Sequence, residues 1–365
     1  MSFLAGRARI VVKVGSSLLV DAVGELRDEW LATLAEDISA LVRGGTQVVI
    51  VSSGAVALGR ASIGLPRGLS LPQKQASAAV GQTMLTQGYA RALCAYDLVS
   101  AQALLTLDDT EDRAGWLNAR ATLDTLLGMG VIPVVNENDT VATDEIRYGD
   151  NDRLAARVAQ MIGADALVLL SDIDGLHTAD PRAHDGAEHI AEVSELTPDI
   201  LDMGGGAGTA HGTGGMATKL MAARIAMGAG CDMAIHDGRA GHPLRRLETD
   251  RITWFRAKGS PLSARRQWIA GSLRPRGEVH VDAGAARAVA ADKSLLVAGV
   301  TAVDGEFQRG DAVDIVCDTP IARGLAAYGA EEARRIRGKR SSDIDAVLGY
   351  SHGPALVHRD NLVRL

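Results

Sequence analysis

The chain has 365 residues, more than one compact core usually contains, so about two domains are expected. Hydrophobic residues make up 47% and charged residues 23%, a composition typical of folded globular proteins and unlike that of disordered chains. The net charge of −7, from 38 basic and 45 acidic residues, gives a nucleic-acid partner no overall electrostatic support.

Membrane and disulfide-rich classes are also disfavoured. No run approaches the ~20 apolar residues of a membrane helix, and residues 1–9 lack the apolar stretch of a secretion signal, so we expect a cytoplasmic protein without membrane contact. Cys94, Cys231 and Cys317 are too sparse for a disulfide framework or a zinc motif. We expect all three to be buried small hydrophobic residues.

The first two thirds of the chain alternate between short apolar runs and longer amphipathic stretches, the pattern of βαβ units around a mostly parallel sheet. Residues 9–14 are β-branched and nearly all apolar, which predicts a strand covered on both faces. Residues 31–42 have apolar side chains at helical spacing, and Gly44-Gly45 predicts the end of that helix. Further strands are predicted at 48–51, 98–104, 131–135, 166–170 and 233–235, and helices from 55 and around 73–95, 115–128, 152–162 and 216–229.

The pattern changes near Lys258. A stretch with Gly, Pro, Ser and clustered Arg follows, and then short strand-like runs separated by Gly and Asp turns, at 278–281, 294–300, 312–317 and 355–357. We therefore expect a first domain over residues 1–258, a linker over 259–275, and a small β-rich barrel or sandwich over 276–365.

Five segments carry residue types suited to phosphate or ammonium binding, and four of them fall just after predicted strands, where ligands bind in such sheets. The first runs from Lys13 to Ser17, a lysine near a strand end followed by a small-residue turn. Taken alone, it is better explained as a solvated lysine. The second, Ser52 to Ala55, presents backbone amides at a helix N-terminus, and it fits an ordinary strand-to-helix turn equally well.

The third segment, Asn136 to Thr140, places two amides and two carboxylates after an apolar strand, a set that suits an ammonium group. A solvated turn needs one Asn or Asp, not a run of four polar residues. The fourth, Gly149 to Asp152, has three residues of the capping type before a helix, and one of them is expected to be an ordinary N-cap. Both segments therefore favour function.

The fifth segment is glycine-rich, runs from Gly204 to Lys219 and opens a helix. Backbone amides at such a helix start bind phosphates, and a lysine one turn later can reach a terminal phosphate. A flexible linker is the alternative. The glycine spacing matches neither a Walker A loop nor a dinucleotide fingerprint.

Together the two lysines, the two turns and the Asn/Asp cluster favour phosphoryl transfer. A carboxylate acceptor, with a pKa of ~4.3, is already ionised at neutral pH and needs no general base. The reaction must relieve repulsion between carboxylate and triphosphate, a term of ~4 kcal/mol per charge pair at 4 Å in an effective dielectric near 20. Lysines and a magnesium ion supply that relief.

Eight segments in order carry a family resemblance: VVKVGSS, IVSSGAVALG, ASAAVGQ, LNARATLDTLL, IPVVNENDTVAT, YGDNDRLAARVA, LLSDIDGLHTADPR and GTGGMATKL. The chain resembles the amino acid kinase family, and within it the glutamate 5-kinases. The resemblance implies an open αβα sandwich with a mainly parallel sheet of about eight strands. It also implies MgATP as donor, glutamate as acceptor, and a place at the first step of proline biosynthesis.

The resemblance also implies roles for individual residues. Lys13 and Lys219 would neutralise the transferred phosphoryl group, and Asp152 would orient both lysines. Glutamate would be held by Ser53, Asp139 and Asn151, with Asn136 close by. The ATP site would comprise Lys13, Ser171, Asp172, Thr213, Gly214, Gly215, Met216, Ala217, Thr218 and Lys219. The resemblance identifies no metal ligands.

The tail, through GEVHVDAGAARAV, KSLLVAGVTAVDGEFQRGDAVDI and IARGLAAYGAEEARRIRG, resembles a PUA domain. Such domains often bind RNA, but acidic residues outnumber basic ones over residues 276–354, so an RNA partner is disfavoured here. The basic residues between Arg334 and Arg340 fit the solvated end of a helix.

Two alternatives stay open at this point. The first is a member of the family that acts on another acceptor, and the second is an RNA-binding PUA protein whose kinase domain is silent. For the leading hypothesis we expect proline as feedback inhibitor, a glutamate-5-semialdehyde dehydrogenase as the candidate recipient of the reactive product, and a homo-oligomeric state.

Overall fold

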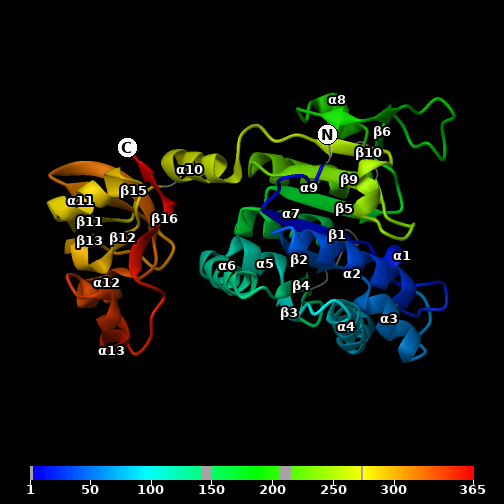
Figure 1. The fold of residues 1–365 in the computed structure, drawn as a ribbon, viewed down its shortest axis with the longest axis horizontal. Helices are drawn as coiled ribbons and strands as arrows, with labels where there is room; N and C mark the ends of the chain where they lie inside the picture. Colours follow the sequence, from blue (N-terminus) through cyan, green and yellow to red (C-terminus); the bar gives the residue numbers. More distant parts are fainter. Residues whose placement is uncertain (1–2, 142–149, 205–214, 273) are drawn as a thin grey trace. The chain divides into compact units, whose positions relative to one another are not determined.

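The structure, a computed structural model, describes residues 3–141, 150–204, 215–272 and 274–365. The chain forms two compact units, Met1–Pro261 and Leu262–Leu365 (Figure 1). Within the stretch 259–275, which we expected to be a linker, the structure has helix α10 (Pro261–Ser272). No helix in the described part of the chain is long and apolar enough to cross a lipid bilayer.

The first unit is built on an eight-stranded sheet. All neighbouring strands are parallel except β9 and β10, which pair in antiparallel fashion. The strand order across the sheet is β3 (Ser100–Leu105), β4 (Ile132–Glu137), β2 (Gln47–Ser52), β1 (Arg9–Val14), β5 (Ala166–Ser171), β9 (Asp232–Asp237), β10 (Ile252–Phe255) and β8 (Glu192–Val193).

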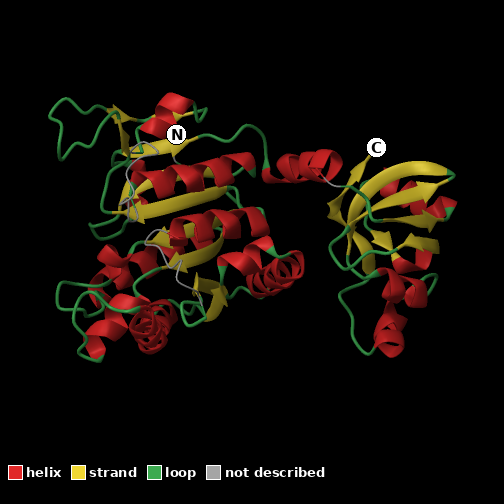
Figure 2. Ribbon diagram, turned by 180° about the vertical axis from the view of Figure 1, so that it is seen from behind, coloured by secondary structure: helices red, strands yellow, loops and turns green. Residues whose placement is uncertain are grey.

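The central strands are buried on both faces, and their successive residues pack into two different cores. In β1, Val11 belongs to the core beneath α6, α7 and α9, whereas Ile10, Val12 and Val14 belong to the core beneath α1 to α4. This alternation follows from the two-residue period of a strand. The first set of helices is α6 (Arg113–Gly128), α7 (Asp150–Ile162) and α9 (Met216–Gly228). The second is α1 (Ser16–Leu19), α2 (Asp28–Arg43), α3 (Ala55–Ser62) and α4 (Leu71–Cys94). The layers can be followed from opposite sides in Figures 1 and 2.

Helices α3 and α4 cross with no side chain between them at one point. A Cβ atom added to Gly81 of α4 would lie 1.8 Å from the carbonyl oxygen of Ala55, and one added to Gly59 of α3 would lie 1.8 Å from that of Ser77. These distances are far below van der Waals contact, so both positions require glycine. The missing side chains let the two helix backbones touch.

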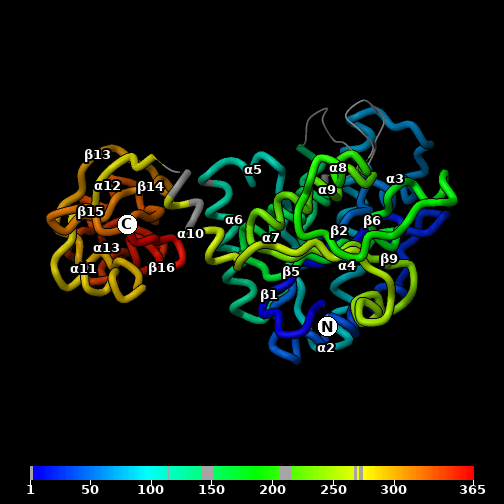
Figure 3. The backbone as a smooth tube through the Cα atoms, turned by 90° about the horizontal axis from the view of Figure 1, so that it is seen from above, coloured from blue at the N-terminus to red at the C-terminus, as the bar shows by residue number. Residues whose placement is uncertain are grey.

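Shorter elements complete the first unit. They are α5 (Leu107–Glu111), the hairpin β6 (Leu176–His177) and β7 (His189–Ile190), α8 (Pro198–Asp202) and the 3-10 turn η1 (Arg245–Glu248). Helices α7 and α9 pack side by side on one face of the sheet (Figure 3).

The second unit contains a six-stranded sheet. Its order is β12 (Leu295–Leu296), β16 (Ala355–Arg364), β15 (Thr319–Ala326), β14 (Ala312–Cys317), β11 (Gly277–Val281) and β13 (Val300–Gly305). The remaining elements are α11 (Ala283–Ala290), η2 (Val297–Gly299), α12 (Ala330–Ile336), η3 (Ser341–Asp343) and α13 (Ile344–Leu348). The apolar residues of these elements form a separate core around Val279, Ile315, Tyr328 and Val357.

The expected fold class is confirmed: a mainly parallel sheet between helices, and a separate β-rich unit. The expectation for the cysteines was wrong in part. Cys231 is buried, but Cys94 is exposed and Cys317 is half-buried. Cys94 is the last residue of α4, and its side chain lies on the solvent side of that helix because Leu93 takes the buried position.

Candidate active site

Three charged side chains meet at the carboxyl ends of the central strands. Lys13 lies near the end of β1, Asp152 in the first turn of α7, and Lys219 in the first turns of α9. The Lys13 Nζ lies 2.6 Å from one carboxylate oxygen of Asp152, and the Lys219 Nζ lies 3.1 Å from the other. All three are buried, with Asp152 only 1% exposed. The structure thus brings together the two lysines expected to neutralise the transferred phosphoryl group and the aspartate expected to orient them.

This cluster has two cations for one anion. Burial raises the pKa of Asp152, but the charges and hydrogen bonds of Lys13 and Lys219 lower it more, and the result is a pKa below the ordinary value for aspartate. The carboxylate is therefore ionised at neutral pH. The cluster carries one unit of excess positive charge in a site largely shielded from water, which is an arrangement suited to a phosphate group.

A second group of side chains lies beside β2 and β4. The Asn151 Nδ2 donates hydrogen bonds to the Ser53 hydroxyl at 2.8 Å and to the Asn136 Oδ1 at 3.2 Å. Ser53 follows β2 in a turn that ends at Gly54, whose φ of +109° is unfavourable for any residue with a side chain. Ser53, Asn136 and Asn151, three of the four residues expected to hold the acceptor, are thus joined by these hydrogen bonds.

Asp139, the fourth, lines an adjacent cavity of about 400 Å³. Helix α4, the edge strand β3 and the loop after β4 form its walls. Gln82 of α4 also lines this cavity and accepts a hydrogen bond from the Asn136 Nδ2 at 2.7 Å. The cavity and the Ser53–Asn136–Asn151 group are thus neighbours that share Gln82.

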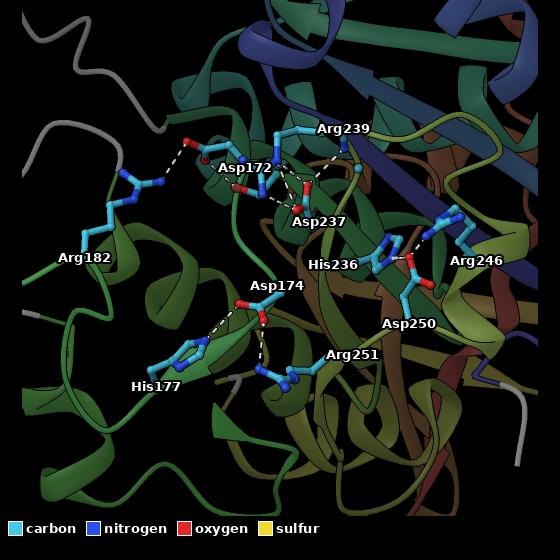
Figure 4. A network of polar contacts seen from close by, with 12 residues as sticks. Asp172, Asp174, His177, Arg182, His236, Asp237, Arg239, Arg246, Asp250 and Arg251 are labelled. Atoms are coloured by element: carbon cyan, nitrogen blue, oxygen red, sulfur yellow. Dashed lines mark hydrogen bonds and ion pairs between the residues drawn. The ribbon is translucent and has the colours of Figure 1, made fainter. Parts of the chain in front are cut away.

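The residues expected at the nucleotide follow β5. Ser171 is buried, and its hydroxyl donates to Asp172 at 3.3 Å. Arg182, from the loop between β6 and β7, contacts the other oxygen of Asp172 at 3.3 Å, as Figure 4 shows. Partial burial raises the pKa of Asp172, but hydrogen bonds from its own backbone amide, Arg182 and Ser171 hold it below the ordinary value.

Helix α9 presents the rest of the expected nucleotide site. Gly215 precedes the helix and supplies no side-chain cap, and Met216 and Ala217 occupy its first turn. The Thr218 hydroxyl lies 2.9 Å from the Gly215 carbonyl oxygen and 3.3 Å from Asp152, which links the helix start to the charged cluster. Thr213 and Gly214, also expected at this site, lie outside the described residues, as do residues 142–149 after Asp139.

Several residues near these groups had no distinct signal in the sequence. Gln82 reads as an ordinary polar residue of an amphipathic helix. Two others are Arg239, which pairs with Asp237 at the end of β9, and the buried His236 of the same strand, which lies 3.5 Å from Asp250 (Figure 4). Over residues 3–141, 150–204, 215–272 and 274–365, no three His, Cys, Asp or Glu side chains are grouped as a metal site would require.

The fold is that of an α/β protein, and two buried lysines meet an aspartate at the carboxyl ends of its strands. The profile of the amino acid kinase family matches residues 8–237, and the profile of the PUA domain matches residues 277–348. The chain belongs to the amino acid kinase family, which confirms the resemblance in the sequence.

Several similar proteins are named glutamate 5-kinase. The chain is 55% identical to glutamate 5-kinase of Paramagnetospirillum magneticum, over 100% of this chain and 99% of that protein. It is 53% identical to glutamate 5-kinase of Agrobacterium fabrum, over 99% of this chain and 94% of that protein. The solved structure of UMP kinase from Bacillus anthracis matches 70% of this chain and 98% of its own chain, with a TM-score of 0.49 and 15% identity.

Proposed function

We propose that this chain is an ATP-dependent kinase that phosphorylates the side-chain carboxylate of glutamate to L-glutamyl 5-phosphate, the first step of proline biosynthesis. The buried cluster of Lys13, Asp152 and Lys219 carries the proposal, because it offers excess positive charge where strand ends and helix starts meet. Relatives named glutamate 5-kinase, similar over the whole chain, support the choice of acceptor.

The chemistry follows from charge. A γ-carboxylate is ionised at neutral pH and attacks the γ-phosphorus without a general base, and ADP leaves. The obstacle is repulsion between two anions, which the ammonium groups of Lys13 and Lys219 reduce. Asp152 holds both lysines in place at 2.6 and 3.1 Å, so the site needs little reorganisation when the charge moves.

The donor is ATP with Mg²⁺, which would be held by the nucleotide phosphates and would offset part of their negative charge. Ser171 and Asp172 hold the nucleotide, and the start of α9, from Gly215 to Thr218, holds phosphate through backbone amides. The uncapped N-terminus of α9 and its link to Asp152 through Thr218 support this assignment.

The acceptor lies between the charged cluster and the 400 Å³ cavity. Ser53, Asn136 and Asn151 bind it together with Asp139, whose carboxylate pairs with the α-ammonium of glutamate. The hydrogen bonds among the first three, and the position of Asp139 in the cavity wall, support the assignment.

Proline, as feedback inhibitor, occupies the same site. Proline shares with glutamate an α-carboxylate and a cationic nitrogen, so Asp139 pairs with both ligands. The variant Asp139→Ala should then weaken both by roughly 2 to 5 kcal/mol, the cost of breaking a desolvated charge pair. The glutamate KM and the proline inhibition constant test this. If glutamate KM rises while proline inhibits as before, the two sites are separate.

The product is a reactive mixed anhydride, so a dehydrogenase of glutamate 5-semialdehyde is the proposed recipient. The enzyme is proposed to act in the cytoplasm as a homo-oligomer.

The domain assignment is also a proposal: residues 1–258 form the catalytic domain, and the tail tunes activity. A chain ending near Lys258 should still phosphorylate glutamate. Loss of all activity in a folded truncation would show that the tail completes the site or an essential oligomer.

The direct test is ATP turnover with a panel of acceptors: glutamate, aspartate, N-acetylglutamate and UMP. Trapping the acyl phosphate with hydroxylamine distinguishes carboxylate transfer from simple ATP hydrolysis. The proposal requires that glutamate be the preferred acceptor. Preference for any other member of the panel, or turnover without a trapped product, would reject it.

A further inference from the structure

The hydrogen-bonded amides of the acceptor site continue into helix α4. Gln82, 9% exposed, accepts from the Asn136 Nδ2 through its Oε1 at 2.7 Å. Its own Nε2 donates to the Thr86 hydroxyl at 3.3 Å, and that hydroxyl donates to the Gln82 backbone carbonyl at 2.8 Å. A chain of five side chains therefore runs from Thr86 through Gln82, Asn136 and Asn151 to Ser53.

Backbone groups fix the direction of this chain. The Glu137 backbone N–H, which can only donate, points to the Asn136 Oδ1 at 2.9 Å. The Asn136 oxygen must therefore face Glu137 and Asn151, and its nitrogen must face Gln82. Reversing the Gln82 amide would place its nitrogen against that of Asn136, two donors with no acceptor between them. Each amide in the chain thus has one allowed orientation.

The fixed orientations leave the amide oxygen of Asn151 free. Its nitrogen is used by Ser53 and Asn136, and its oxygen is buried and has no hydrogen-bond partner among the residues that the structure describes. A buried acceptor without a donor is costly, and it is expected to meet one when a ligand binds. An amide oxygen can only accept, so the free Asn151 Oδ1 favours a ligand group that donates, such as an ammonium group.

The glycine contact between α3 and α4 accounts for the position of Gln82. Gly81, its neighbour in the chain, lies directly against the backbone of α3 at Ala55. Helix α3 starts just after the Ser53–Gly54 turn of the acceptor site. The touching backbones therefore hold the Gln82 side chain at a fixed distance from the residues that it orients.

We infer that Gln82 is a positioning residue for the acceptor: by accepting from the Asn136 Nδ2 it holds in place the amide that the Glu137 N–H orients, so that Asn151 keeps its free amide oxygen for the α-ammonium of the substrate. The inference rests on the proposed function. It assigns to α4, whose Gln82 also lines the cavity beside Asp139, a part in acceptor selection.

The test compares three variants of the full-length chain. Gln82→Leu keeps the volume and removes the acceptor for Asn136. Gln82→Glu keeps an oxygen at that place, and the Thr86 hydroxyl is able to turn and donate to the second oxygen. Ser77→Ala is the control, because it also replaces a buried polar side chain of α4, and the Ser77 hydroxyl has no partner among the described residues. Each is assayed for the KM of glutamate, the KM of ATP, kcat and Tm, with glutarate as the acceptor that lacks the ammonium.

For Gln82→Leu we expect the glutamate KM to rise about tenfold or more, while the KM of ATP changes less than twofold. The preference for glutamate over glutarate, measured as the ratio of kcat/KM, should fall by a similar factor. Gln82→Glu should lie closer to the parent than Gln82→Leu, and Ser77→Ala should match the parent.

Three results would overturn the inference: an unchanged glutamate KM in folded Gln82→Leu, equal changes in both KM values together with a lower Tm, or a Gln82→Glu variant no better than Gln82→Leu. The proposed function fails separately, since in that case the parent chain itself does not phosphorylate glutamate.

Discussion

Replacing Asp152 by asparagine removes one negative charge and almost no volume from the centre of the site. The carboxylate faces Lys13 at 2.6 Å and Lys219 at 3.1 Å. At an effective dielectric of about 20, the two attractions are about 6 and about 5 kcal/mol before the cost of desolvating the charges. That cost offsets much of the sum, and loss of one partner from a buried ion pair typically destabilises a protein by about 3 to 5 kcal/mol.

We therefore expect Asp152→Asn to lower the free energy of unfolding by about 3 to 5 kcal/mol. For a unit of this size each kcal/mol shifts Tm by about 2 to 4 °C, so the expected drop is roughly 6 to 20 °C. MgATP brings negative charge to the same lysines. The rise in Tm on adding MgATP should accordingly be larger for Asp152→Asn than for the parent, even though kcat falls by orders of magnitude.

Thermal unfolding with and without MgATP measures the drop in Tm and the rise in Tm on adding MgATP, and steady-state kinetics measures kcat. Asp28→Asn is the control: the same chemical change in an exposed ion pair with Arg91, which should cost at most about 1 kcal/mol. A Tm for Asp152→Asn within the error of that control, or an unchanged kcat, would refute the role of the Asp152 carboxylate in holding the two lysines.

Three further predictions concern single positions. Lys219→Ala and Lys219→Arg should both lower kcat by orders of magnitude, since the planar guanidinium does not replace a compact ammonium; near-normal turnover in either would contradict its role. Gly81→Ala should reduce the free energy of unfolding by about 1 to 3 kcal/mol, because the added Cβ meets the backbone of α3. Gly128→Ala is the control, since there is open space around Gly128. Equal denaturant midpoints for the two variants would contradict the prediction. Burial lowers the pKa of His236 more than Asp250 raises it, so the unfolded chain takes up a proton first as the pH falls below about 6.5, and stability should decrease there. His236→Gln should flatten this dependence of Tm on pH and the exposed His358→Asn should not, and identical slopes in all three proteins would exclude His236 as the cause.

The sequence predicted the elements with strong local patterns. Strands β1 and β14 have the predicted limits, because each is an apolar run bounded by turn residues. Strand β15 was missed since Pro320 and Gly324 disguise it, and β16 was predicted only over 355–357 because the polar residues from His358 to Asn361 interrupt its apolar pattern. In both strands, pairing with neighbours decides the structure against local preference.

The candidate site, too, could be predicted from the sequence only in part. Polar segments at strand ends could be identified because a parallel sheet places its ligand there. The sequence could not show which of these side chains contact one another, since Asn151 and Ser53 are separated by 98 positions in the chain. Gln82 was invisible for a further reason: one glutamine on a helix usually faces solvent, and only the close approach of α3 and α4 turns it inward.

The alternation of β1 between two cores has a consequence for insertions and deletions. Val11 and Lys13 face the helices α7 and α9, while Ile10, Val12 and Val14 face the opposite core. Losing one residue near the start of this strand would shift its register and turn Lys13 toward the apolar side, away from Asp152. Losing two would restore the facing of every side chain, although it would move Lys13 by about 6.6 Å along the strand. We therefore expect that, in a library of chain-length variants around residues 7–10, changes by an even number of residues preserve the two cores and the folded state, and changes by an odd number do not.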